Sequence, residues 1–405
     1  MQLFTRHYVA SSSGSTPEPQ SDNKPSLGDA QARLTARVFV VLLPVLSWAH
    51  LSSAQEVRVI SLRRLERFVD SAFLSITSVR ELDDGSVILS DPRDGRLVLI
   101  DRQSRSIQTI GRSGRGPGEY PAAFPVRPLR GDSSIMIDPA SRRWLYLVGG
   151  RIAGVEPADA RVIVATRGRA MGVDSLGNVL AYRDSPLGYG VTRIGPHDST
   201  VVLIVDRASG RQQEVVSLRR APVTLTRSRQ GRGASLQGVM PPFSTGEEVL
   251  LFPDGWLAVA RLEPYRIEWR KPDGSWVQGA PIPYKKVPVD AAEKALWLAN
   301  AKANGVSLPV PSADLDWPEY VPPFAPLPLV ATSDGLLLVL RLETSRDSER
   351  RYDLVGRDGR LSASVELSRS VRIVGFGKNS VYLERRDDDG FRWLLRHAWP
   401  VSQQR

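Results

Sequence analysis

One pattern recurs along the chain, a turn containing glycine that is followed at once by a short apolar run. The runs read VILS, IMI, NVLA, WLAVA, LLLVL and SVYL, and each ends within a few residues at a polar residue or another turn. Such short runs are typical of β-strands, because a helix needs roughly ten residues or more to bury one face. The turn glycines are Gly85, Gly131, Gly177, Gly255, Gly335 and Gly377.

The spacing of these glycines predicts the number of repeats. Successive glycines are 46, 46, 78, 80 and 42 residues apart, and three of these steps match the ~40–50 residues of one four-stranded propeller blade. The two long steps would contain insertions, at about 205–245 and 283–329, since neither holds a second turn of this kind. Counting them as skipped blades would instead make eight.

We therefore expect an all-β fold, a six-bladed β-propeller of four-stranded antiparallel blades with a short helical insertion. The helix is predicted at 290–304, capped by Asp290 and ended by Gly305. The glycine-led strand should lie near the axis, where neighbouring blades cover both of its faces. Glu56–Leu62 alternates polar and apolar residues and is expected to close the ring as the outer strand of the last blade.

The N-terminal segment has the order of a secretory signal. Arg33 and Arg37 precede the apolar run Val38–Ala49, and small residues follow up to Ala54. The run is about a dozen residues long, whereas a membrane span needs roughly 20, so a permanent anchor is the weaker alternative. We expect cleavage after Ala54.

This interpretation divides the chain into two parts. Residues 1–54 form a leader whose first 32 residues are polar, Ser- and Pro-rich and expected to be disordered. Residues 55–405 form a single propeller domain. The mature protein is then periplasmic or secreted, without a stable membrane span, and is expected to be a monomer.

Composition limits the chemistry that the chain can perform. Cysteine is absent, which excludes disulfides, thiolate nucleophiles and cysteine zinc sites. The histidines are His7, His50, His197 and His397, and the first two lie in the leader. Two remaining histidines cannot build a three-histidine metal site. We predict no catalytic residue, no metal ligand and no cofactor from local motifs.

The charge balance is the next constraint on the partner. The net charge is +10, with 7 Lys among 54 basic residues, which leaves 54 − 7 = 47 Arg. That ratio is typical of a GC-rich genome. Codon usage therefore accounts for the excess of arginine, and we expect that nucleic acid is not the partner. A ligand that is anionic remains compatible with the charge.

Gly111–Tyr120, GRSGRGPGEY, directly follows a predicted strand and precedes several prolines. This segment resembles the inter-blade loop of NHL-like propellers, in particular a secreted bacterial six-bladed group with a Gly-Pro-Gly-Glu-aromatic turn. The resemblance covers roughly residues 80–150 and implies architecture more than chemistry. A dinucleotide-binding loop would need a helix after the glycines, whereas prolines follow here.

Two sets of residues are candidates for ligand binding. Arg93, Arg112 and Arg115, with Glu119, are predicted to form a rim on one face, suited to a carboxylate or phosphate. The alternative for this loop is a purely structural crossing between blades. In the second insertion, Trp317 and Tyr320 could stack on a sugar or peptide, or the segment could simply pack against the rim.

A basic segment lies in the first insertion. Seven arginines occur between Arg207 and Arg232, against Glu214 alone. This predicts an extended hairpin with a basic tip, which could contact anionic groups or remain a solvated hairpin.

The sequence favours an exported, non-enzymatic binding module whose ligand is a protein, a saccharide or an anion. The alternative is a metal-dependent hydrolase or lyase on the same scaffold, because ligands supplied by several blades leave no local motif. Propeller lyases use histidines and propeller lactonases use a central calcium held by carboxylates. The side chains that line the central channel should distinguish the two classes.

Overall fold

The structure, a computed structural model, divides the chain into two units, residues 1–55 and 56–405. The predicted leader and its cleavage site lie outside the described residues. In the described part, no helix is both long and apolar enough to cross a membrane. The described residues are 57–62, 66–116, 118–138, 141–157, 170–183, 199–221, 224–230, 233–239, 241–303, 308 and 311–399.

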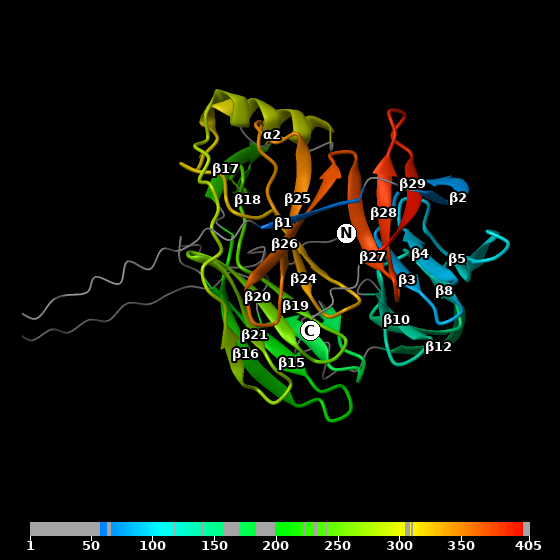
Figure 1. Ribbon diagram of the computed structural model, residues 1–405. Coiled ribbons are helices and arrows are strands. Elements are labelled where there is room, and N and C mark those ends of the chain that lie inside the picture. Colours follow the sequence, from blue (N-terminus) through cyan, green and yellow to red (C-terminus); the bar gives the residue numbers. More distant parts are fainter. Residues whose placement is uncertain are drawn as a thin grey trace, which may run out of the picture. The chain divides into compact units, whose positions relative to one another are not determined.

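Six β-sheets form the blades of the second unit (Figure 1), each with four antiparallel strands, and the fifth gains β1 (Arg58–Ser61) as an additional strand. The predicted six-bladed propeller with a short helix is confirmed. The first three blades are β3 (Ser78–Glu81), β4 (Val87–Asp91), β5 (Arg96–Ile100) and β6 (Ile107–Ile110); β9 (Val126–Pro128), β10 (Ser133–Asp138), β11 (Arg143–Val148) and β12 (Arg151–Pro157); and β13 (Ala170–Val173), β14 (Val179–Tyr182), β15 (Ser199–Val205) and β16 (Gln212–Arg219). The last three are β19 (Glu248–Leu251), β20 (Leu257–Leu262), β21 (Tyr265–Arg270) and β22 (Trp276–Gln278); β23 (Leu329–Ala331), β24 (Leu337–Leu340), β25 (Glu349–Val355) and β26 (Leu361–Ser368); and β27 (Val371–Phe376), β28 (Ser380–Arg386), β29 (Arg392–Ala398) and β2 (Glu66–Phe73).

Each marker glycine lies just before the second strand of its blade. Gly85, for example, has φ of 83°, a conformation that suits glycine because it has no Cβ. The strand that follows is fully buried, as in β4, but it is second from the axis. The innermost strand of every blade is the one before the glycine, so the predicted axial position is shifted by one strand.

Several elements lie outside the six blades. The strands β7 (Arg112–Ser113) and β8 (Glu119–Tyr120) pair within the inter-blade loop, and β17 (Thr224–Gln230) and β18 (Gly233–Val239) form a separate hairpin. The first predicted insertion therefore overlaps β16, which is the fourth strand of the third blade. The second insertion holds α2 (Ala291–Ala303) and the short η1 (Ser312–Asp314). Asp290 caps α2, since its carboxylate accepts the Ala292 and Glu293 amides at 3.0 and 3.1 Å.

The predicted role of Glu56–Leu62 in ring closure is wrong. Within it, β1 (Arg58–Ser61) pairs in parallel with β26 and so extends the fifth blade. The last blade is completed by the next segment, β2, which pairs with β29. The reason is packing: β2 places Phe68, Val69 and Phe73 in the core between the last and first blades, whereas three of the four residues of β1 are exposed.

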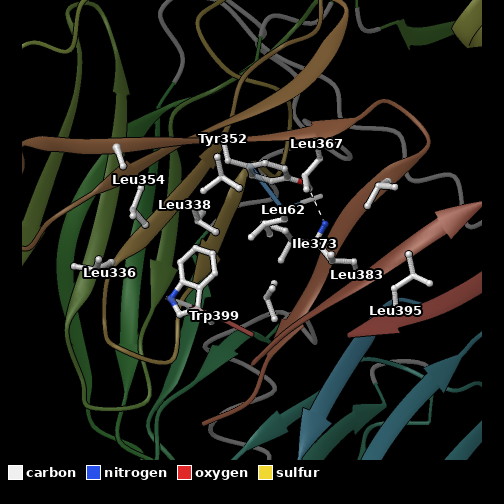
Figure 2. Close-up of a cluster of buried hydrophobic side chains, with 14 residues drawn as sticks. Leu62, Leu336, Leu338, Tyr352, Leu354, Leu367, Ile373, Leu383, Leu395 and Trp399 are labelled. Atoms are coloured by element: carbon white, nitrogen blue, oxygen red, sulfur yellow. Dashed lines mark hydrogen bonds between the residues drawn. The ribbon is translucent and has the colours of Figure 1, made fainter. Parts of the chain in front are cut away.

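Apolar side chains fill the contacts between neighbouring blades. Figure 2 shows the contact between the fifth and sixth blades, where Leu338 and Leu354 face Leu383 and Leu395. Leu62 packs into the same cluster. The Ile373 amide donates to the Tyr352 hydroxyl at 3.3 Å across this contact. These clusters hold the ring together because burial of apolar surface is the main favourable term in folding.

One buried carboxylate joins the first blade to the last. Glu81 accepts hydrogen bonds from the Lys378 amide at 3.0 Å, from the Ser380 hydroxyl at 2.8 Å and from the Tyr382 hydroxyl. A Cβ at Gly377 would lie 2.2 Å from this carboxylate. The last marker glycine thus leaves the space that Glu81 occupies.

Candidate functional site

The innermost strands enclose a central channel of about 640 Å³, a size that suits a small organic ligand. All six blades contribute to its wall, and most of the contributed side chains are apolar. The six blades contribute, in order, Ser78, Val126, Val173, Val249, Val330 and Val374, among other residues.

The two ends of the channel differ because the innermost strands run in one direction. We call the end where these strands begin the loop face, and the end where the glycine turns follow them the turn face. Strand order places the turn Pro92–Gly95 and the loop Gly111–Tyr120 together on the loop face. The connections carrying the β17–β18 hairpin and α2 also leave and re-enter the blades at this face.

Arg127 lies on the channel wall, between Val126 and Pro128 of β9. Burial lowers the pKa of this guanidinium, and no described carboxylate offsets that effect. Two other channel arginines differ in this respect. Arg350 pairs with Glu343 at 2.6 Å, and Arg372 pairs with Glu384 at 2.8 Å. Among the described residues, Arg127 is thus a channel cation without a counter-ion, which makes it a candidate anion-binding group.

Glu248 is the carboxylate of the channel wall, at the start of β19. Burial raises its pKa to about 7, and the Leu327 amide, donating at 3.3 Å, only partly opposes that shift. Burial, and to a lesser extent the nearby Glu248 carboxylate, raises the pKa of Tyr182. Glu248 is therefore close to half protonated at neutral pH and can donate as well as accept a hydrogen bond.

The raised pKa predicts a pH-dependent stability gain for Glu248→Gln. The folded pKa of about 7 lies above the ordinary 4.5, so folding favours the neutral carboxyl and stability falls as pH rises from about 4.5 to 7. A neutral glutamine escapes this loss. We expect the variant to be more stable than the wild type by up to about 3 kcal/mol near pH 8, and to match it near pH 4.

Urea unfolding at the two pH values measures this difference. Asp388→Asn, a change in an exposed turn, is the control and should show no comparable pH-dependent gain. An equal stability difference at both pH values would contradict a raised pKa for Glu248.

Of the arginines predicted to form a basic rim, Arg93 lies near arginines of the last blade. Arg372 and Arg392 share the buried Glu384 carboxylate, at 2.8 and 3.3 Å. Burial lowers the pKa of Arg392, Glu384 opposes this, and the nearby charges of Arg386, Arg372 and Arg93 lower it further. Arg93 thus lies near Arg392, in a cluster that also contains Arg372 and Arg386, and Arg372 connects that cluster to the channel wall.

Arg112, Arg115 and Glu119 instead stabilise their own loop. The Glu119 carboxylate accepts from the Arg112 side chain at 2.5 Å and from the Gly116 amide at 2.7 Å. The Arg115 carbonyl accepts from Arg143 at 2.9 Å. The Arg112 side chain is 80% exposed, so a ligand can reach it, but these contacts already explain the motif as a folded crossing.

The two predicted stacking residues have separate environments. Trp317 packs against Phe243 and Trp297, with ring centroids 6.2 and 5.6 Å apart. Tyr320 is 39% exposed, and Lys286 lies over its ring. Neither lines the channel.

The second insertion is held against the loop that follows β24. Glu293, fully buried, accepts from the Ser345 amide and hydroxyl and pairs with Arg346 at 2.9 Å. A segment fixed by these contacts supports the packing alternative for the insertion.

The described residues contain no group of three or more His, Asp or Glu side chains placed to hold a metal ion. His397 is on β29, and the other histidines lie outside the described residues. The basic segment Arg207–Arg232 extends over β16 and the hairpin β17–β18.

Arg127 and Glu248 are not among the residues predicted from the sequence. The sequence signal for them is weak. Each is a charged residue in a short, mostly apolar segment, which reads PVRPL around Arg127 and EEVLLF around Glu248. Their strands, β9 and β19, are only three and four residues long. Both precede the marker glycine, whereas the repeat is defined by the apolar run that follows it.

No family model matches the chain, and no curated protein matches it. Among solved structures, a candidate exported protein from Bacteroides fragilis is 11% identical, with 84% of this chain and 100% of that chain covered and a TM-score of 0.45. A member of the DUF4221 family from Bacteroides vulgatus is 9% identical, with 83% and 98% covered and a TM-score of 0.41. Virginiamycin B lyase from Staphylococcus aureus is 9% identical, with 84% and 89% covered and a TM-score of 0.35. The six-bladed propeller is established by the strand pairing of this chain itself, and its ligand has to be argued from its side chains.

Proposed function

We propose that this chain is an exported, non-catalytic binding protein whose channel takes one small organic anion from the loop face. The observation that carries the proposal is Arg127, a channel cation that no described carboxylate neutralises. An oxyanion beside it would supply the missing charge and accept its hydrogen bonds.

The rest of the wall supports the same class of ligand. The valines of the innermost strands offer apolar contact to a carbon skeleton. Glu248 and Tyr182 offer hydrogen bonds to hydroxyl groups on that skeleton. A carboxylated sugar combines all three features, and about 640 Å³ accommodates a ligand of that size.

Export rests on the secretory order of residues 1–54. The arginine cluster containing Arg93 and Arg372 would attract an anion towards the loop face. That attraction should weaken as salt rises.

Isothermal titration of the mature protein with glucuronate, galacturonate, succinate and glucose phosphate tests the proposal. We expect one of these compounds to bind with a stoichiometry of one, and more tightly near pH 6 than near pH 8, because neutral Glu248 does not repel an anion. The proposal would be contradicted if none of the four compounds bound with a Kd below about 1 mM. Turnover that a chelator abolishes would instead establish the hydrolase or lyase alternative.

A further inference from the structure

A second cavity, of about 940 Å³, lies at the turn face. Its wall is formed by the segments that follow the innermost strands of five blades. It shares Pro253 and Ala331 with the channel, so the channel continues into it. The proposed function does not use this cavity.

Basic side chains dominate one side of the cavity. Arg80, Arg102, Lys378 and Arg396 line it, and all belong to the first and last blades. Thr332 and Ser333, from the fifth blade, are among the neutral residues of the wall. Glu81 and Asp83 also line the cavity, so its wall carries four cationic and two anionic side chains.

Two of the basic residues are already engaged by the protein. Arg80 donates to the carbonyls of Glu81 and Gly131 at 2.5 and 2.7 Å, with Asp83 nearby. Arg396 lies 3.6 Å from the Glu81 carboxylate. Even so, the Nε atoms of Arg80 and Arg396 are buried without a hydrogen-bond partner among the described residues. Glu81 itself is taken up by the contacts that close the ring.

The other two basic residues have no such partner. Neither the Arg102 guanidinium nor the Lys378 ammonium forms an ion pair or a hydrogen bond with any described residue. Arg102 extends across the glycine turn, where a Cβ at Gly85 would lie 2.6 Å from its Cδ. This glycine thus gives the Arg102 side chain room to lie along the cavity wall. The cavity therefore carries two positive charges that the described protein does not balance.

We propose that the turn-face cavity is a second anion site, distinct from the channel site, for an organic anion with two or more oxyanionic groups. One group would bridge Arg102 and Lys378, and another would lie beside the exposed part of the Arg396 side chain, which is 35% exposed. Guanidinium groups favour planar carboxylates and phosphates because they donate in a fixed fork.

The test uses citrate and inorganic phosphate as probes, titrated into the Arg127→Gln variant so that the channel site does not contribute. We expect citrate to bind with a stoichiometry of one. Arg102→Gln and Lys378→Gln, each added to that background, should weaken binding by about tenfold or more, and Lys378→Glu should weaken it further. Arg360→Gln is the matched control, since this arginine is 82% exposed and lines neither cavity.

The outcomes separate the two proposals. If Arg127→Gln alone abolishes citrate binding, or if Arg102→Gln and Lys378→Gln weaken it no more than Arg360→Gln, the turn-face site is refuted. Citrate could still bind the Arg127→Gln variant while this substitution weakens the binding of none of the tested compounds. In that case the channel proposal fails and the turn-face site stands. Tighter binding of phosphate than of citrate would assign the site to phosphate groups, whereas the reverse would assign it to carboxylates.

Discussion

Glu81→Ala should destabilise the propeller by about 3–5 kcal/mol, the largest stability loss that we expect from one side chain. The Glu81 carboxylate accepts three hydrogen bonds from the last blade, from the Lys378 amide and the Ser380 and Tyr382 hydroxyls. Removing it leaves those buried donors without an acceptor and leaves Arg396 without its nearest carboxylate. It also opens a void beside Gly377.

Urea unfolding of the mature domain measures this loss. Glu81→Gln, which keeps one acceptor oxygen, should lose clearly less than Glu81→Ala. Glu214→Ala is the matched control, because Glu214 pairs with Arg183 on the surface and both side chains are about half exposed, so at most about 1 kcal/mol is expected. A Glu81→Ala loss no larger than that of the control would show that this carboxylate does not join the first blade to the last.

Arg127→Gln should weaken binding of the channel ligand by between about 30-fold and 1,000-fold. Binding in the channel removes the anion from water, and in the variant no guanidinium at position 127 compensates for that loss. Glutamine keeps the approximate length and polarity of the side chain. The change therefore removes the charge while the wall stays filled.

Stability and binding can be separated for this variant. Since burial already opposes the Arg127 charge and no described carboxylate balances it, Arg127→Gln should be at least as stable as the wild type in urea. Arg360→Gln, which removes an exposed charge, should change binding less than about threefold. A full-affinity Arg127→Gln protein would contradict the assignment of Arg127.

The six blades could be predicted because the second strand has a local signal. It is buried on both faces and follows a turn that requires glycine, as at Gly85 and Gly335. In the first blade, the run VILS that follows Gly85 lies within β4.

Ring closure and the site depend on contacts between distant residues, and these have no local signal. The segment that contains β1, EVRVISL, alternates polar and apolar residues, whereas β2, ERFVDSAF, does not, so alternation favoured the wrong segment for completing the last blade. Glu81 and Ser380 are 299 positions apart. In the same way, Arg127 and Glu248 line one channel only because β9 and β19 both face the axis. The predicted Arg112–Glu119 pair was visible in sequence because the two residues are close in the chain, but it stabilises the loop.

The most direct test of the central claim is a crystal structure of the mature domain with its tightest-binding anion. The account predicts one ligand in the central channel, with an oxyanionic group in hydrogen-bond contact with the Arg127 guanidinium, about 2.7–2.9 Å away. A ligand-free channel at saturating anion, with the bound molecule elsewhere on the propeller, would contradict it.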